Sequence, residues 1–557
     1  MQREKHSGMK LCGLRKTKKT KIALLVGLIV STSVHSSPLD FTASANAEAI
    51  YQDIASESLG RRSLTTLQLT PRVNALYQSR TFNGLWSGTL THIERDNTDV
   101  TQTEDYAEYQ YSAKWAAIDR LLSFQANGAL NYRNASAENF LVSDFLTNGS
   151  DLAKVRSNQL SSTLNLDQGD WIRAQGQAAY SKVESDQSEN RGGVALNSET
   201  YRTQGLLYHG DEASMVFWSV KGAYSQTERE NRGSGDFVTR SGLANADIML
   251  LNNWGIRLTA QHEANQLSDR TDTFSQKREF NSYGAGLTFR KSENRYISVT
   301  ANTSDSDIEE DDNETYIGLD LKWAFSSRTS VAASYGRRFF GESGSFDFNY
   351  NTKKVRSSIS YSEDVTSTSR LLANPENLGV FVCPVGSTSI ATCFQPNSLD
   401  YRPDAGEQLV QFTSQNLELD DNIILRKSTN AQIGYDFSRL AVALSWRYSE
   451  NDYLEEDRLR RTYGGGINTS WELGSYTSLT ADVNYANIEQ RSAEFNNGES
   501  ENWRYSVGVS REIGQHLNAT LNFSLIDKSG DAGLDGDFFG NDYTDRRISV
   551  GVTYSYE

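Results

Sequence analysis

The chain has 557 residues, of which 37% are hydrophobic, 11% aromatic and 23% charged, with 27 Tyr and only 6 Pro. Its mean hydropathy of −0.58 excludes a bundle of apolar transmembrane helices. The aromatic content excludes a disordered chain, and the formal charge of −16 excludes nucleic-acid binding through the net field. An all-β protein remains.

The first 36 residues read as a secretory signal peptide. Five basic residues lie between positions 15 and 21, and the apolar run IALLVGLIV follows from Ile22. Small residues then offer a cleavage site before Ser37. The run is too short for a spanning helix, so we predict a signal peptide over residues 1–36 and export to the periplasm.

Two of the three cysteines, Cys383 and Cys393, follow this leader. In an oxidising compartment we expect them to form one local disulfide. A metal site is the weaker interpretation, because no histidine or third cysteine lies near them.

The rest of the chain repeats one pattern, in which segments of about ten residues alternate apolar with small or polar side chains. The last segment shows it most clearly, since Ile548, Val550, Val552, Tyr554 and Tyr556 alternate with Ser, Gly and Thr. This period of two predicts strands with one apolar and one hydrophilic face.

A soluble sandwich would alternate in the same way, but two features favour a membrane barrel. Aromatic residues such as Tyr132, Tyr224 and Phe325 lie at segment ends, where interfacial girdles occur. Short connections also alternate with long, mostly acidic ones. The predicted fold is a single up-and-down antiparallel barrel over residues 37–557, with about 24 strands (22 to 26), in a bacterial outer membrane.

The inner face of such a barrel is predicted from the polar positions of each segment. Neutral amides and hydroxyls dominate there, with single charges between them. The candidates are Arg173, Gln175, Gln177, Asp347, Asn349, Arg356 and Ser360. A wall of this kind suits a hydrated sugar polymer better than one ion, whose pore would carry rings of one sign.

The stretch 366–418 lacks clean alternation and holds four of the six prolines and both late cysteines. Proline suits non-strand positions. We therefore predict an outer loop that folds over or into the mouth as a constriction. An exposed loop outside the pore is the alternative.

No catalytic or cofactor motif accompanies these segments. Four histidines remain after the leader, at positions 92, 209, 262 and 516, and no G-x-S-x-G elbow or Walker A loop is present. We predict a non-enzymatic protein without a cofactor or a resident metal. Acidic stretches near 305–314 and 527–542 leave calcium binding open, although neither has EF-hand spacing.

Several segments resemble a known family. YGRRFFGESGSFDFNYNTKKVRSSISYSEDVTSTSR (335–370), TPRVNALYQSRTFNG (70–84) and NASAENFLVSDFLTNGSDLA (134–153) carry the resemblance. They are similar to the uncharacterised outer-membrane proteins associated with PEP-CTERM/exosortase systems. The resemblance implies a setting beside exopolysaccharide production and export, and it supplies no catalytic residues.

The leading hypothesis is thus a porin-like conduit of an envelope polysaccharide pathway. Its expected partners are outer-membrane lipid, lipopolysaccharide and periplasmic polysaccharide-export components. A structural or adhesive surface barrel, and a sheath around an electron-transfer protein, are the alternatives. TonB-dependent uptake is disfavoured, because residues 37–40 leave no plug before the first strand.

Overall fold

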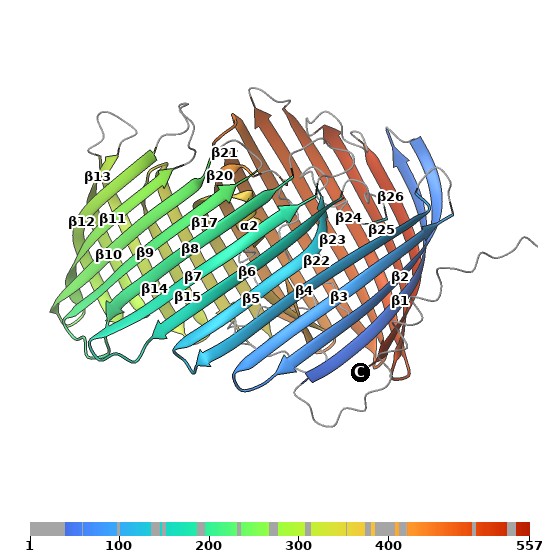
Figure 1. The fold of residues 1–557 in the computed structure, drawn as a ribbon, viewed down its shortest axis with the longest axis horizontal. Coiled ribbons are helices and arrows are strands. Elements are labelled where there is room, and N and C mark those ends of the chain that lie inside the picture. Colours follow the sequence, from blue (N-terminus) through green and yellow to red (C-terminus); the bar gives the residue numbers. More distant parts are fainter. Residues whose placement is uncertain are drawn as a thin grey trace, which may run out of the picture.

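A computed structural model shows one closed ring of 24 antiparallel strands (Figure 1). It describes residues 39–57, 60–96, 101–134, 145–146, 152–186, 195–230, 235–266, 277–306, 314–352, 354–373, 380–384, 407–411, 419, 421–492, 497–531 and 542–556. The predicted signal peptide, residues 1–36, lies outside the described residues.

The ring is an up-and-down meander in which each strand pairs with its neighbours in sequence, and β1 closes it by pairing with β26. Its first twelve strands are β1 (Leu39–Ser56), β2 (Gly60–Gln78), β3 (Phe82–Arg95), β4 (Thr103–Ile118), β5 (Leu122–Asn134), β6 (Leu152–Leu166), β7 (Ile172–Ser185), β8 (Asn197–His209), β9 (Val216–Arg229), β10 (Phe237–Leu251), β11 (Trp254–Gln266) and β12 (Lys277–Ser292).

The second half of the ring is β13 (Arg295–Ser306), β14 (Thr315–Ser326), β15 (Thr329–Arg338), β16 (Gly341–Asn351), β17 (Val355–Ser367), β20 (Ile423–Asp436), β21 (Leu440–Tyr453), β22 (Arg458–Gly474), β23 (Thr477–Ser492), β24 (Gly498–Ile513), β25 (Leu517–Asp531) and β26 (Tyr543–Tyr556). Between β17 and β20 lie the helix α2 (Thr368–Ala373) and a separate two-stranded sheet of β18 (Val380–Pro384) and β19 (Glu407–Gln411). The predicted fold class and the count of about 24 strands are confirmed.

The two faces of the sheet differ as the alternation predicts. Large apolar side chains such as Leu287 and Val550 are 64% and 57% exposed, and they alternate with buried or half-buried polar side chains. An exposed apolar outer face on a closed ring is the form in which a sheet crosses a bilayer, since closure leaves no unpaired backbone edge. The structure is therefore a transmembrane barrel. Within the described residues, no helix is long and apolar enough to cross a membrane.

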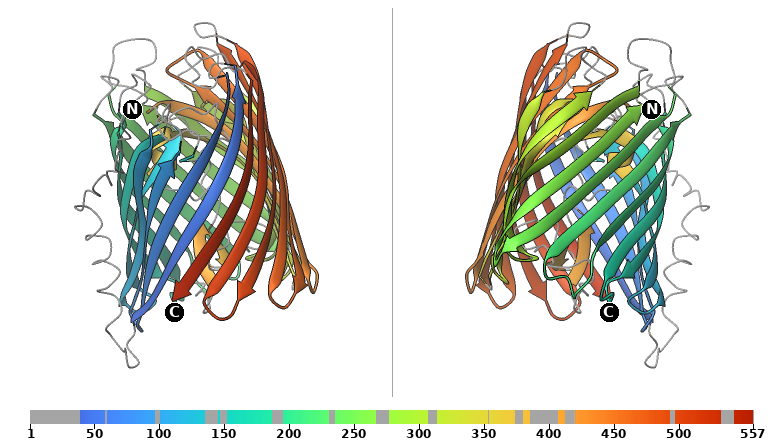
Figure 2. Two further views of the ribbon diagram at one scale, coloured as in Figure 1. Left: turned by 90° about the vertical axis from the view of Figure 1, so that its right-hand side faces the viewer. Right: turned by 90° about the vertical axis from the view of Figure 1, so that its left-hand side faces the viewer.

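The ring is flattened rather than round, being broad in Figure 1 and narrow in the two perpendicular views of Figure 2. On the inner face, the neighbouring strands β12 and β13 leave no room for a side chain at Gly286, where a Cβ would lie 1.9 Å from the carbonyl oxygen of Val299. Flattening brings inner faces of distant strands into reach of one another.

The ring strands are longer than the ten-residue segments expected from the sequence, at 10 to 19 residues. Pairing continues past the apolar band: β1 and β2, for example, stay in register from Leu39–Tyr77 to Ser56–Gly60. At the outer end, β23 and β24 likewise stay paired as far as Gln490 and Gly498.

Connections at the end that carries the C-terminus have two to six residues, which is typical of periplasmic turns. At the opposite, outer end, the expectation of long loops is wrong at four hairpins. The β15–β16 connection has two residues, the β1–β2 connection three, the β21–β22 connection four and the β23–β24 connection five. Two of these short turns are used in packing: Phe339 is buried, and Glu455 makes an ion pair across the ring.

Opposite effects of a charge on the two faces are expected from this arrangement. Leu287→Arg places a charge on the lipid face and should reduce assembly, at a cost of roughly 2–4 kcal/mol at mid-depth. Ser360→Arg, on the inner face of β17, should assemble normally. Heat-modifiable mobility of outer-membrane fractions measures both, and equal assembly of the two variants would contradict the assignment of faces.

Candidate functional site: a bridge across the lumen

The main feature inside the ring is the segment that leaves the outer end of β17 and returns to β20. Its described inner part, residues 367–373, 419 and 421–423, is called the lumen bridge below. β17 and β6 lie nearly opposite one another, with ten ring strands between them on one side and twelve on the other. α2 nevertheless contacts both β6 and β7 as well as β17. The lumen bridge therefore crosses the interior.

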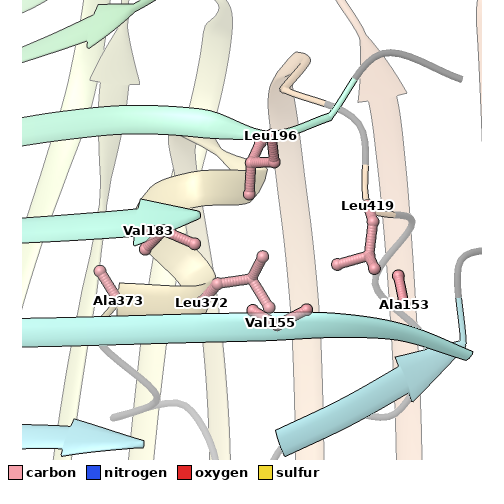
Figure 3. Packing of buried hydrophobic residues seen from close by; sticks show 7 residues of the cluster. All are labelled: Ala153, Val155, Val183, Leu196, Leu372, Ala373 and Leu419. Carbon is pink, nitrogen blue, oxygen red and sulfur yellow. The ribbon is translucent and has the colours of Figure 1, made fainter. Parts of the chain in front are cut away.

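Apolar packing fixes the far end of the bridge. Leu372 and Ala373 of α2 and Leu419 pack with side chains from the β6–β8 wall, as Figure 3 shows; these are Ala153, Val155, Val183 and Leu196. All seven are less than 10% exposed. Val155 and Val183 belong to the inner faces of β6 and β7, because the exposed Leu160 and Ile172 have the opposite parity.

Arg370 of α2 makes polar contacts with β9 and β10. Its Nε donates to Thr227 Oγ1 at 2.7 Å, and its Nη2 donates to the carbonyl oxygen of Phe237 at 3.1 Å. The guanidinium also lies 4.0 Å from the centroid of the Phe237 ring, a cation–π contact. Burial lowers the pKa of Arg370 to about 9, so the group is still charged at neutral pH.

Asp421 connects the two segments of the bridge, 367–373 and 421–423, to the opposite wall. Its carboxylate accepts hydrogen bonds from Ser369 Oγ at 2.8 Å and from Ser198 Oγ of β8. Its backbone oxygen accepts from Arg229 Nη1 of β9 at 3.1 Å. Arg229 in turn forms a two-point ion pair with Glu455 of the β21–β22 turn, at 2.8 and 3.0 Å. Because Arg229 is only 1% exposed in its side chain, this pair is removed from solvent.

A second apolar cluster closes the neighbouring part of the outer mouth. It joins β10, β12, the β15–β16 turn, β17 and β20 through Phe237, Phe280, Phe339, Val365 and Ile423. β10 and β12 are not ring neighbours of the paired strands β17 and β20, so the cluster is a contact between walls. Arg338 adds an ion pair to Glu263 of β11 at 2.6 Å.

The periplasmic end carries charge contacts instead of a bridge. Arg173 of β7 reaches Glu293 in the β12–β13 turn at 2.5 Å and Asp211 at 2.8 Å. The hydrogen bond from Arg173 holds the pKa of Glu293 below its usual range. Further along this wall, Asp247 binds both Arg257 and Arg290 at 2.6 Å.

The structure places the predicted inner-face residues in two separate groups. Arg173, Gln175 and Gln177 share the face of Val183 on β7, where Gln177 accepts from Gln204 Nε2 at 2.5 Å. Asp347 and Asn349 of β16 contact each other at 2.5 Å. Asp347 is the register partner of Ser360, and Asn351 that of Arg356. The ring does not bring the β7 group and the β16–β17 group together.

Sequence reasoning missed the residues that hold the bridge, namely Ser198, Arg229, Arg370, Asp421 and Glu455. Their sequence separations, such as 223 residues between Ser198 and Asp421, leave no local pattern. The predicted loop 366–418 did mark the segment, through its prolines and lost alternation. Its cysteine pair stays a prediction, because Cys393 lies outside the described residues.

A pH dependence follows from Asp421. Burial raises the pKa of this carboxyl, outweighing the hydrogen bonds from the two serines. A raised folded-state pKa stabilises the bridge fully below the unfolded value of 3.8, and that contribution is lost as pH rises through the folded pKa. The bridge should therefore detach more readily as the pH rises above 3.8, which ion conductance across planar bilayers would measure. Asp421→Asn should abolish the trend, and an unchanged trend in that variant would refute the assignment to Asp421.

No protein-family model matches this chain, and no curated protein sequence matches it. Among solved structures it is similar to the siderophore receptor PirA from Pseudomonas aeruginosa, at 10% identity over 94% of this chain and 81% of the receptor, with a TM-score of 0.37. It is also similar to the FrpB iron transporter from Neisseria meningitidis (F5-1 variant), at 10% identity over 93% and 82%, with a TM-score of 0.42. A third is OccK8 (OprE) from Pseudomonas aeruginosa, at 10% identity over 93% and 99%, with a TM-score of 0.31. The barrel fold itself rests on the strand pairing described above.

Proposed function

We propose that this protein is a non-enzymatic, porin-like channel of a bacterial outer membrane whose outer mouth is constricted by the lumen bridge. The observation that carries the proposal is the bridge itself. A purely structural barrel has no need of a segment that crosses its interior and is anchored on the far wall by apolar packing and by hydrogen bonds from Ser198 and Arg229. A channel does need one, because a ring of 24 strands is too wide to be closed by its own wall side chains.

The histidines support a role without catalysis. His92 contacts Asp105, His262 contacts the amide of Asn281, and His516 contacts a backbone oxygen. His209 contacts the backbone oxygen of Trp218 and lies 3.5 Å from Glu293. Each of these contacts is with a residue of the barrel wall, so they suit a structural role.

The proposed cargo is a sugar polymer of an exopolysaccharide pathway, as the sequence resemblance implies. Inner-face pairs such as Gln177–Gln204 and Ser112–Asn127 support this, because amides and hydroxyls exchange hydrogen bonds readily with sugar hydroxyls. Periplasmic polysaccharide-export components would then deliver the polymer to the short turns of the ring.

Contact with lipopolysaccharide is proposed for the outer rim of the lipid face. Tyrosines there donate to carboxylates two residues nearer the rim, as Tyr448 does to Glu450 at 2.9 Å, and the same carboxylate binds Lys427 and Arg461. Tyr361 and Glu363 repeat the arrangement on β17. Aromatic rings followed by charges suit the boundary between acyl chains and headgroups.

Single-channel recording from purified protein in planar bilayers tests the proposal. The channel function predicts discrete conductance steps that neutral oligosaccharides reduce from one side. Absence of any step, with correct heat-modifiable folding, would favour a structural or adhesive surface barrel. The sheath alternative is opposed by the bridge, because an enclosed electron-transfer partner requires a free lumen.

A further inference from the structure

Two arginines on the inner wall next to the bridge have no acidic partner. Arg426 of β20 and Arg447 of β21 face the lumen, because the exposed Ile433 and Trp446 have the opposite parity on the same strands. Arg447 lies opposite Asn430 in the strand register, and its Nε donates to the Asn430 amide oxygen at 3.1 Å. In the described part of the chain, neither guanidinium forms an ion pair with a carboxylate.

Arg426 is the more unusual of the two. It is 8% exposed, and its Nε has no hydrogen-bond partner. A buried cation without a partner is costly, and such groups normally have a counter-charge. In a chain with a net charge of −16, carboxylates for this purpose are plentiful. The absence of one here points to a ligand.

The carboxylates at adjoining register positions bind other cations. Asp364 is the register partner of Arg426 on β17, but its carboxylate accepts from Arg338 at 3.4 Å. Glu450, beside Lys427, lies on the lipid face and binds Lys427 and Arg461. Among the described residues, neither carboxylate forms an ion pair with Arg426 or Arg447.

The surroundings of the pair are polar and neutral. Ser428 and Ser449 lie opposite one another between the two arginines, and Asn451, opposite Arg426, has an amide oxygen without a hydrogen-bond partner. Arg447 and Asn430 are only half-buried, so this end of the patch opens toward the lumen. Four residues of strand separate the levels of Arg426 and Arg447, about 13 Å at roughly 3.3 Å per residue.

We propose that Arg426 and Arg447, with Asn430, Ser428, Ser449 and Asn451, form a binding subsite for an acidic sugar polymer. The two guanidiniums would each bind a carboxylate or phosphate, and the amides and hydroxyls between them would bind sugar hydroxyls. The separation of the two cations favours a chain with repeated charges over one small oxyanion. The inference rests on the proposed channel function and names its substrate class.

Binding is measured by calorimetric titration of detergent-purified protein with tetragalacturonate, with maltotetraose as the neutral match and inorganic phosphate as the small anion. Wild-type protein should bind tetragalacturonate at least about tenfold more tightly than either. Arg426→Gln/Arg447→Gln should lose that preference. The control variant Arg72→Gln/Arg133→Gln removes two charges from the inner faces of other strands, and it should keep the preference for tetragalacturonate.

Each outcome decides the matter. Unchanged binding of tetragalacturonate to Arg426→Gln/Arg447→Gln overturns the subsite, and equal losses in both double variants overturn it in favour of a general field. Equal binding of phosphate and tetragalacturonate overturns the polymer as ligand. If Arg426→Gln/Arg447→Gln does not assemble, Arg426→Lys/Arg447→Lys replaces it. This variant keeps the charge but loses the two-point hydrogen bonds of a guanidinium, so its preference for tetragalacturonate should be smaller than that of the wild type, and an unchanged preference overturns the subsite. Calorimetric titration measures binding to the subsite, and bilayer recording measures channel function. Failure of one proposal can therefore be distinguished from failure of the other.

Discussion

Replacing residues 368–421 by a short Gly/Ser linker is expected to raise the single-channel conductance several-fold while the barrel still assembles. The linker removes α2 and the Asp421 contacts, which are the described groups that cross the lumen. It leaves both β17 and β20 intact, and their pairing from Val355–Tyr435 to Ser367–Ile423 closes the ring without help from the bridge. Conductance in planar bilayers and heat-modifiable mobility are the two measurements.

The matched control keeps the loop and changes only its apolar contact. Leu372→Ser weakens the packing of α2 on Val155 and Val183 but leaves Arg370 and Asp421 in place. We expect this variant to open briefly, and each opening should reach the conductance of the linker variant, because the weakened bridge detaches and rebinds. A linker variant that assembles and conducts like wild type would show that the bridge does not limit the pore.

Arg229→Gln is expected to destabilise the contact between β9, the β21–β22 turn and the bridge by about 3–5 kcal/mol, the usual cost of removing one member of a buried ion pair. The substitution leaves Glu455, whose side chain is 14% exposed, without its cation, and it removes the donor to the backbone of Asp421. The open fraction of the channel should rise accordingly, while assembly of the ring is kept by strand pairing.

The double variant Arg229→Gln/Glu455→Gln separates the ion pair from packing. Two neutral amides of similar size can hydrogen-bond one another, so much of the loss should be recovered, and the coupling energy should be well above 1 kcal/mol. Additive effects of the two single substitutions would contradict a direct Arg229–Glu455 interaction.

The sequence predicted the ring well, because lipid and water on opposite faces impose a strict period of two on every strand. In β26, for example, the alternation assigns Val550 to the outer face and Ser549 to the inner face without information about any partner strand. The same rule places Arg173, Gln175 and Gln177 on one face. It does not say which inner residues meet across the lumen, since flattening of the ring is a collective property of many strands.

The bridge illustrates that limit. Prolines and lost alternation mark residues 366–418 as something other than strand, but contacts such as Arg370–Thr227 depend on where β9 lies relative to the end of β17. The short β15–β16 turn is a similar case. Nothing local in Phe339 indicates that it packs against Phe237 and Phe280 of other strands.

The most direct test of the account is a cross-link from the bridge to the far wall in intact outer membranes. Leu372→Cys/Val183→Cys, with Cys383 and Cys393 changed to Ser, is treated with a short bifunctional methanethiosulfonate and then recorded in bilayers. Each end of the reagent forms a reducible disulfide with one cysteine and releases methanesulfinate. A bridge across the lumen predicts an efficient intramolecular cross-link, a closed and quiet channel, and openings after reduction. No cross-link in assembled barrel, or a conductance that ignores the cross-link, would contradict it.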